Sequence, residues 1–261
     1  MEPLVDLLSG RNVAVLSGAG LSTESGIPDY RGPQTRQRVR NPIQYRQFVD
    51  DPAWRARYWA RATLGWPRIR DARPNDGHVA LAALGWPVIT QNVDRLHARA
   101  GTDAIELHGA LAEVVCLTCG DVTDRDALQT ELLRRNPHLH HLTAAAAPDG
   151  DADLVEAADV PSCRCGGILK PHVVFFGENV PRDRVERAYA HVDDAEALLV
   201  VGSSLTVFSG FRFVKRAASR GIPIAIVDLG PTRGDPLATL KVEVPTGEAL
   251  PFLARRLRGA G

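Results

Sequence analysis

The sequence lacks the features of a membrane protein, a secreted protein and a nucleic-acid-binding protein. No apolar run approaches the roughly 18 residues that a membrane-spanning helix requires. The start of the chain, Met1 to Leu4, has no positive segment followed by a long apolar core, as a signal peptide would have. Basic and acidic residues both number 31, so no net charge attracts nucleic acid or an acidic membrane surface. We therefore expect a cytoplasmic globular protein that binds neither nucleic acid nor a membrane. The composition indicates no oligomeric state.

Cysteine is also scarce, with four residues in a chain of 261. In a secreted protein four cysteines could form two disulfides, but without a signal peptide they are better explained as metal ligands. Cys116 and Cys119 have the spacing of a zinc knuckle, and Cys163 and Cys165 supply a second pair after a long interval. Four thiolates form a closed tetrahedral site, which is structural and not catalytic. The sequence therefore predicts one structural zinc ion.

A strand followed by a glycine-rich loop indicates a phosphate-binding site near the start of the chain. The apolar run 12–16 predicts a buried strand, and Gly18 and Gly20 let the following loop turn tightly and approach a ligand. A helix beginning near Ser22 would direct free N–H groups at a pyrophosphate. No lysine lies nearby, so an ATP-binding P-loop is disfavoured, and Thr23 stands where a dinucleotide-binding fingerprint has its third glycine. An ordinary strand-to-helix turn therefore remains an alternative for this loop.

The residues after this loop favour a ligand site over such a turn. Asp29, Tyr30 and Arg31 place a carboxylate, an aromatic ring and a guanidinium directly after the glycines. Such a run seldom serves packing alone. It predicts a nucleotide site.

Further apolar runs predict a doubly wound α/β fold whose strand ends converge on one crevice. Strands are expected at 87–90, 105–108, 197–201 and 222–227. They lead into these polar or small residues: Gln91, Asn92, Asp94, His108, Gly202, Ser203, Ser204 and Asp228. In open parallel sheets, ligands bind at the carboxyl ends of the strands. The amides and the carboxylate of 91–94 suit ribose hydroxyls and a carboxamide, although Asn92 or Asp94 could equally cap a helix.

The histidines differ in how well they fit a catalytic role. His108 is a candidate general base, because the unperturbed pKa of histidine lies near neutral pH. It could equally be a core histidine with its hydrogen bonds satisfied. Weaker candidates are His78, His97 and His172. The histidines of a polar, alanine-rich stretch are expected at the solvated surface: His138, His140 and His141.

Two inserts interrupt the α/β pattern. Residues 33–74 hold many arginines, three of the four tryptophans, and apolar residues at helical spacing, which predicts a helical insert with basic outer faces. The cysteines belong to a second insert, with an irregular excursion expected at 137–161. We predict a Rossmann-like parallel sheet and a smaller lobe, with the active site in the cleft between them. The sheet domain is assigned to 1–34, 75–111 and 169–261, the helical module to 35–74 and the zinc-binding module to 112–168.

Together, these motifs resemble those of the sirtuins, a family of NAD-dependent protein-lysine deacylases. The resemblance is carried by the run from Gly18 to Arg31, by 90–97, by His108-Gly109, by the paired cysteines, and by 173–178 and 202–205. These motifs occur in the family's order and cover nearly the whole chain. The remaining sequence, including Gly230 to Arg233, looks most like the mitochondrial-type branch.

The resemblance implies that NAD is the co-substrate. It assigns cofactor binding to Gly18, Ala19, Gly20, Ser22, Thr23, Asp29, Tyr30, Arg31, Gln91, Asn92, Asp94, Gly202, Ser203, Ser204 and Asp228. The acyl oxygen would attack the ribose carbon as nicotinamide leaves, with Asn92 holding that ribose. His108 would then remove a ribose hydroxyl proton as general base, and the acyl group would pass to ADP-ribose.

The resemblance also implies a partner, an acyl-lysine protein or peptide. Its backbone would pair as an added strand along a segment containing Val173, Phe175, Phe176 and Gly177. Tyr58 and Arg61, three residues apart on one helix face, match a pair that contacts the acyl carboxylate in sirtuins that remove acidic acyl groups. This match predicts a preference for longer or carboxylated acyl groups. Ordinary packing of the aromatic ring with an exposed arginine is the alternative.

The sequence departs from the sirtuin pattern at three places. Tyr30 replaces a more usual Phe, Asp228 replaces a more usual Asn, and one residue instead of two separates Cys163 from Cys165. The third departure means that the second cysteine pair must differ in geometry from a C-x-x-C knuckle. Two other functions remain open, mono-ADP-ribosyl transfer to protein and non-catalytic sensing of NAD or ADP-ribose. His108 argues against a sensor, because binding alone needs no base there.

Overall fold

The structure is a computed structural model that describes residues 1–30, 42–145, 147–152 and 156–259. Its strands are β1 (Val13–Ser17), β2 (Val88–Thr90), β3 (Ala104–Glu106), β4 (Gly109–Cys116), β5 (Val122–Asp124), β6 (Leu169–Val173), β7 (Ala197–Val201), β8 (Ile224–Val227) and β9 (Leu240–Val242). Its α-helices are α1 (Glu2–Leu8), α2 (Tyr45–Asp50), α3 (Pro52–Asp71), α4 (Asp76–Leu84), α5 (Leu96–Arg99), α6 (Arg125–Arg135), α7 (Arg182–Asp193), α8 (Phe208–Ser219) and α9 (Thr246–Arg258). Short 3-10 helices are η1 (Ala19–Ser25), η2 (Pro137–His141), η3 (Pro148–Gly150) and η4 (Asp235–Leu237). Within the described ranges, no helix has the length and apolar character needed to cross a membrane.

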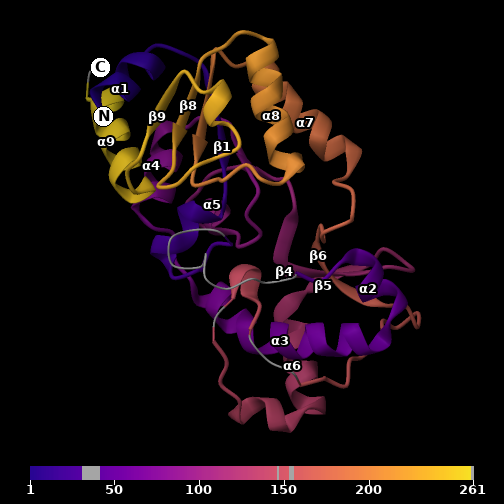
Figure 1. Ribbon diagram of the computed structural model, residues 1–261. Helices are drawn as coiled ribbons and strands as arrows, with labels where there is room; N and C mark the ends of the chain where they lie inside the picture. Colours follow the sequence, from indigo (N-terminus) through magenta and orange to yellow (C-terminus); the bar gives the residue numbers. More distant parts are fainter. Residues whose placement is uncertain (31–41, 146, 153–155, 260–261) are drawn as a thin grey trace.

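A six-stranded parallel sheet forms the larger lobe, in the order β3-β2-β1-β7-β8-β9. Every residue of β1 and β7 is buried, which explains why both read as continuous apolar runs. Helices α1, α4 and α9 pack on one face of the sheet, and α7 and α8 pack on the other (Figure 1). The predicted Rossmann-like sheet is confirmed.

The smaller lobe combines a three-stranded antiparallel sheet, β5-β4-β6, with α2, α3 and α6 (Figure 1). Its core contains Trp59 and Trp66 of α3. The guanidinium of Arg125, on α6, lies 5.3 Å from the ring centre of Trp59 and 5.5 Å from that of Trp66. The indole of Trp59 also donates to the carbonyl of Leu169 at 3.2 Å, which joins α3 to β6. Aromatic packing therefore holds α3 against α6 and β6.

Segments far apart in the sequence meet in this lobe. β6 pairs with β4, so residues 169–173 belong to the small sheet and not to the large one. Its register places Cys116 opposite Leu169, which brings the two cysteine pairs to the same end of the sheet. The division of the chain into the three modules assigned above stays a prediction.

The first loop is folded differently from the expected helix near Ser22. The chain forms a 3-10 helix, η1, which begins directly after Gly18 and is followed by Gly26, whose φ is 83°. Only glycine adopts that conformation without steric cost, so the chain turns sharply there into 27–30.

β3 is shorter at its carboxyl end than the strand expected at 105–108. It stops at Glu106, so His108 lies in the crossing to β4, and β6 stops at Val173, so that Phe175, Phe176 and Gly177 lie beyond it. Gly109 has a φ of 79°, and a Cβ there would lie 2.1 Å from the carbonyl oxygen of His172. Because β6 crosses so closely, the chain turns at this glycine. The turn leaves His108 outside the sheet.

Candidate active site

A cavity of about 910 Å³ opens where the two lobes face each other. Its walls come from the loops after β1, β2, β7 and β8, from α3, and from the segment after β6. The cavity lies at the carboxyl ends of the parallel strands, where ligands bind in doubly wound sheets. The sequence-predicted residues that line it are Gly18, Ala19, Gly20, Thr23, Asp29, Tyr30, Tyr58, Arg61, Gln91, Asn92, His108, Val173, Phe175, Phe176, Gly177, Gly202, Ser203, Ser204 and Asp228. Arg31 lies outside the described residues.

The glycines of the first loop pack against the loop that follows β7. A Cβ at Gly20 would lie 2.9 Å from the Cα of Gly202, and the Gly20 N–H donates to the Gly202 carbonyl at 2.8 Å. Gly202 has a φ of 58°, and a Cβ there would lie 2.3 Å from the amide nitrogen of Leu21. The absence of side chains therefore lets two strand-end loops meet backbone to backbone. Ligand approach alone, the reason expected from sequence, does not explain these glycines.

Two predicted cofactor residues lie behind the cavity wall and not on it. The hydroxyl of Ser22 donates to Asp94 at 2.6 Å and accepts from the side-chain amide of Asn92 at 3.0 Å. Asp94 also accepts from the backbone N–H of Leu96 at 2.9 Å. Ser22 and Asp94 are thus engaged with protein groups, and they fix the amide of Asn92, which does line the cavity.

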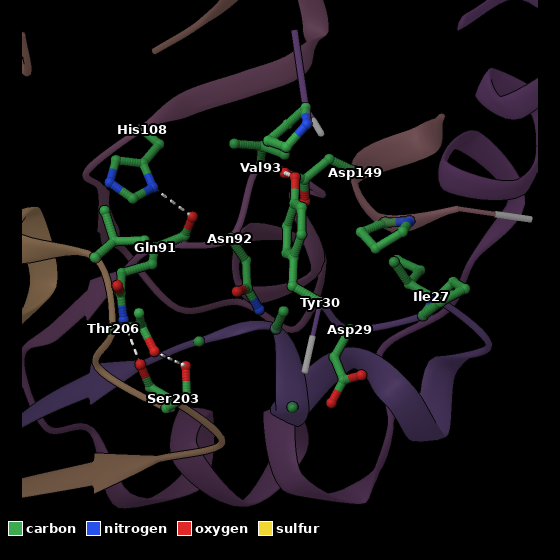
Figure 2. Close-up of a pocket in the computed structure, with 18 of the residues that line it drawn as sticks. Ile27, Asp29, Tyr30, Gln91, Asn92, Val93, His108, Asp149, Ser203 and Thr206 are labelled. Carbon is green, nitrogen blue, oxygen red and sulfur yellow. Dashed lines mark hydrogen bonds between the residues drawn. The ribbon is translucent and has the colours of Figure 1, made fainter. Parts of the chain in front are cut away.

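His108 lies on the cavity wall, and Figure 2 shows its hydrogen bond to Gln91. Nδ1 is 2.9 Å from the carbonyl oxygen of Gln91, and Nε2 is 2.8 Å from the hydroxyl of Ser209. A carbonyl can only accept, so Nδ1 carries the proton and Nε2 presents its lone pair. The side chain of Gln91 is held in turn, since it donates to Ser203 at 2.7 Å. His108 therefore has a fixed orientation, with Nδ1 protonated and Nε2 able to accept a proton.

The electrostatic surroundings keep His108 uncharged. Burial lowers its pKa to about 4, the hydrogen bond to Gln91 opposes this shift, and the positive charges of Arg184 and Arg212 add to it. At neutral pH the imidazole can therefore accept a proton. A strongly shifted pKa in a cleft is typical of functional residues.

The irregular segment around η3, for which the sequence indicates no function, also forms part of the wall. Tyr30 donates its hydroxyl proton to Asp149, which the turn η3 carries into the cavity (Figure 2). Burial raises the pKa of Asp149 to about 6, and the pKa of Tyr30 lies well above its usual range for the same reason. The ring of Tyr30 meets that of Phe176 edge to face, with centres 6.2 Å apart. The expected irregular excursion at 137–161 thus reaches the site.

Tyr58 is both a core residue and a wall residue. Its ring packs edge to face against Phe48, Trp59 and Phe175, with centres 5.3 to 5.4 Å apart. The residue also lines the cavity. The packing and the substrate-binding readings of Tyr58 are therefore compatible.

Arg61 lines the cavity with its charge already matched. Its Nε donates to Asp151 at 2.8 Å and to the carbonyl of Ala152 at 3.0 Å, and a second nitrogen contacts the other oxygen of Asp151. The guanidinium thus holds one carboxylate in a two-point contact. The alternative interpretation, an exposed arginine, does not hold, because Arg61 is tied to the segment next to η3.

Two of the weaker histidine candidates lie behind the glycine loop. Nε2 of His97 is 2.8 Å from the hydroxyl of Ser17, and the rings of His78 and His97 meet with centres 5.0 Å apart. Asn75 contacts His78 Nδ1 at 3.0 Å and donates to the carbonyl of Leu21 at 2.7 Å. These side chains support the loop from the core. His172 pairs with Glu113 at 2.8 Å, and the three histidines at 138–141 are exposed, as expected.

The four cysteines come together at the far end of the small sheet. Their sulfur atoms all lie within 4.8 Å of one another, with Cys116 and Cys165 3.5 Å apart and Cys119 and Cys163 3.8 Å apart. A tetrahedral zinc ion with Zn–S bonds of about 2.3 Å separates its ligands by about 3.8 Å, whereas a disulfide needs about 2 Å. The donor set fits structural zinc despite the shortened second pair. Gly167 makes room, because a Cβ there would lie 2.6 Å from the Cys116 sulfur.

A family model and similar proteins of known name all point to one family. The family model described as "Sir2 family" matches residues 18–209. "NAD-dependent protein deacetylase 1" of Mycobacterium avium is 54% identical, covering 97% of this chain and 94% of the relative. "NAD-dependent protein deacetylase" of Xanthomonas campestris is also 54% identical, covering 92% of this chain and 85% of the relative.

Solved structures agree with these relatives. The structure described as "Sir2-p53 peptide-NAD+" has a TM-score of 0.79 at 31% identity and covers 100% of this chain and 99% of its own. A mutant Sir2 homologue in complex with ADP-ribose has a TM-score of 0.78 at 29% identity, covering 100% and 97%. The match extends over sequence and fold. The chain belongs to the Sir2 family, the sirtuins.

Proposed function

We propose that this protein is an NAD-dependent protein-lysine deacylase that transfers the acyl group of a protein or peptide substrate to ADP-ribose and releases nicotinamide. The observation that carries the proposal is the uncharged His108 with its Nε2 lone pair directed at Ser209 in the cavity wall. Its relatives are named NAD-dependent protein deacetylases, and one similar structure is described with both a peptide and NAD+.

The residues present suit NAD. The glycine loop lines the cavity at Gly18 to Gly20, and Asp228, directly after β8, offers a carboxylate for ribose hydroxyls. Asn92 has its amide fixed by Ser22 and would hold the nicotinamide ribose. When bound, NAD supplies an electrophilic ribose carbon and a leaving group. The contribution of the protein is orientation and exclusion of water, which can supply a large part of a rate enhancement.

The remaining wall residues suit the acyl-lysine. Phe175, Phe176 and Val173 supply an apolar passage beside Tyr58, in which an uncharged acyl chain is favoured over water. Tyr30 would shield the reactive carbon from solvent. Gly177 has a φ of 80°, so the segment turns there, and a substrate strand would pair along the part of it that lines the cavity.

The test follows a label on NAD and a label on the acyl group. A deacylase yields free acyl-ADP-ribose and unmodified lysine, a mono-ADP-ribosyltransferase places ADP-ribose on protein, and a sensor gives no turnover. We expect the first outcome. We also expect His108→Ala to bind NAD and lose about 10²- to 10⁴-fold in turnover, as removal of a general base does. Near-normal turnover in this variant would contradict the role of His108.

We propose further that the enzyme resembles the mitochondrial-type branch in preferring longer or carboxylated acyl groups, such as succinyl or glutaryl, to acetyl. The support is that Tyr58 and Arg61 project from α3 to the same cavity. Arg61 already binds Asp151, so a substrate carboxylate would take the place of Asp151 at the guanidinium. The preference therefore depends on how easily this exchange occurs.

A panel of acyl-lysine peptides, assayed for nicotinamide release, tests the preference. Arg61→Met should reduce activity on succinyl-lysine more than activity on acetyl-lysine. Asp151→Asn should raise activity on succinyl-lysine. Arg68→Met is a matched control, because Arg68 is exposed on the same helix and does not line the cavity. If acetyl-lysine is the best substrate and Arg61→Met leaves the ranking unchanged, the preference is wrong while the deacylase assignment stands.

We also propose that the protein acts in the cytoplasm, and that the sheet domain, the helical module and the zinc-binding module act as units once 169–173 is counted with the small lobe. In support, the cysteines are unpaired and grouped as a metal site suited to a reducing compartment.

A further inference from the structure

The first turn of α8 brings a hydroxyl to the catalytic histidine candidate. Ser209 lines the cavity, and its Oγ lies 2.8 Å from His108 Nε2. Since Nδ1 of His108 donates to the Gln91 carbonyl, the Nε2 atom has no proton and the serine hydroxyl must be the donor. The Oγ lone pairs remain available to accept a proton from the cavity side.

The packing of α8 fixes this contact. Gly210 follows Ser209, and a Cβ at this position would lie 2.2 Å from Oε1 of Gln91. Gln91 is itself held by Ser203 at 2.7 Å. The helix therefore lies directly on the residue whose carbonyl orients the imidazole, and both hydrogen-bond partners of His108 belong to one rigid unit.

We propose that Ser209 is a further catalytic residue, which relays a proton from a substrate ribose hydroxyl to His108. The proposal rests on the deacylase function proposed above. In the relay, the ribose proton passes to Ser209 Oγ while the serine proton passes to His108 Nε2. One ribose O–H bond and one serine O–H bond break, and one serine O–H bond and one N–H bond form. The products of the step are a ribose alkoxide, a neutral serine and an imidazolium.

The geometry favours a relay over direct contact between His108 and the ribose. A direct contact would require a ribose hydroxyl to displace Ser209 from Nε2, whereas a relay keeps the observed hydrogen bond. Proton transfer through one intervening group is effective when each hydrogen bond is short. The Ser209 contact, at 2.8 Å, meets that condition.

The first test uses nuclear magnetic resonance of the free protein and needs no co-substrate. In ¹⁵N-labelled protein, His108 is assigned by comparison with His108→Ala. We expect its Nε2 resonance to shift downfield in Ser209→Ala, because the nitrogen loses a hydrogen bond. Ser219→Ala is the matched control, a serine on the same helix that bonds the Arg216 carbonyl at 2.8 Å. An unchanged Nε2 resonance in Ser209→Ala would overturn the contact.

The second test separates the two halves of the reaction with an acetyl-lysine peptide and NAD. Ser209→Ala should lower product formation by about tenfold or more. It should leave the exchange of labelled nicotinamide into NAD unchanged, and Ser209→Thr should restore product formation. In H₂O/D₂O mixtures, the rate of product formation by the parent should vary with the deuterium fraction along a curve, because two protons move together. In Ser209→Ala the rate should vary linearly.

The outcomes distinguish the relay from the proposed function. No NAD-dependent turnover in the parent would refute the deacylase. An active parent with unchanged product formation in Ser209→Ala would refute the relay alone. Equal losses in exchange and product formation would also refute it, because a general disturbance of the site affects both steps.

Discussion

Asp94 accepts a hydrogen bond from Ser22 at 2.6 Å, and both side chains are buried behind the cavity. Ser22 also accepts from Asn92 at 3.0 Å. A carboxylate behind the wall thus controls the position of an amide on the wall. Two strand-end segments that are 72 residues apart are joined by one serine hydroxyl.

We predict that Asp94→Ala destabilises the protein and weakens NAD binding. The change leaves the Ser22 hydroxyl and the Leu96 N–H without their acceptor, at a cost of about 1–3 kcal/mol in the free energy of unfolding. Denaturant titration and calorimetric NAD binding measure both effects. Asp6→Ala is the control, since Asp6 is exposed on α1. Equal results for the two variants would show that the buried contact is unimportant.

Gly202→Ala should be more damaging than an ordinary glycine substitution. An alanine at this position would be strained by the left-handed φ, and its Cβ would lie 2.3 Å from the Leu21 nitrogen. Gly221→Ala is matched, because its φ is 69° and its Cβ would meet nothing within 4 Å. We expect the control to lose about 1 kcal/mol of stability and Gly202→Ala about 1–3 kcal/mol more. Urea denaturation gives the difference, and similar losses in both variants would argue against the close approach of the loops.

The buried histidines predict how stability depends on pH. Burial lowers the pKa of His78 to about 4 and that of His97 to about 3, from a usual value of 6.5. Below pH 6.5 the unfolded chain binds protons that the folded chain does not, so the free energy of unfolding falls as the pH falls toward 4. Above pH 6.5 these residues contribute no further change.

Urea denaturation at several pH values between 6.5 and 4 measures this slope. His97→Gln, which keeps a group able to contact Ser17, should make the slope shallower. His140→Gln should not, because His140 is exposed. An unchanged slope in His97→Gln would mean that His97 is protonated in the folded state.

The cysteine cluster predicts one zinc ion per chain. Cys116→Ser or Cys165→Ser should lose the metal and lower the midpoint of thermal unfolding by more than about 5 °C, because zinc binding is coupled to folding. Arg164 is exposed and lies between two of the ligands, so Arg164→Ala should keep the metal and the midpoint of thermal unfolding. Elemental analysis and calorimetry provide the measurements. Active protein without metal, or with a disulfide between Cys116 and Cys119, would contradict the zinc site.

Several features followed from the sequence because they depend on local pattern. The apolar runs of β1, β2, β7 and β8 were sufficient to predict a parallel sheet, since strands buried on both faces contain few polar residues. The carboxyl ends of those strands meet at one edge, so residues such as Gln91 and Gly202 could be assigned to one crevice. The cysteine spacing predicted a metal cluster, which the sulfur positions fit.

Tertiary structure alone decided which side chains complete the site. Ser209 lies 101 residues from His108, and Asp151 lies 90 residues from Arg61. A serine in the first turn of a helix and an aspartate in an irregular segment carry no pattern that distinguishes them from capping or solvated residues. Their partners are fixed by how α8 packs on Gln91 and where η3 meets α3. A contact between distant segments depends on the packing of the whole chain, and a local run of residues does not specify it.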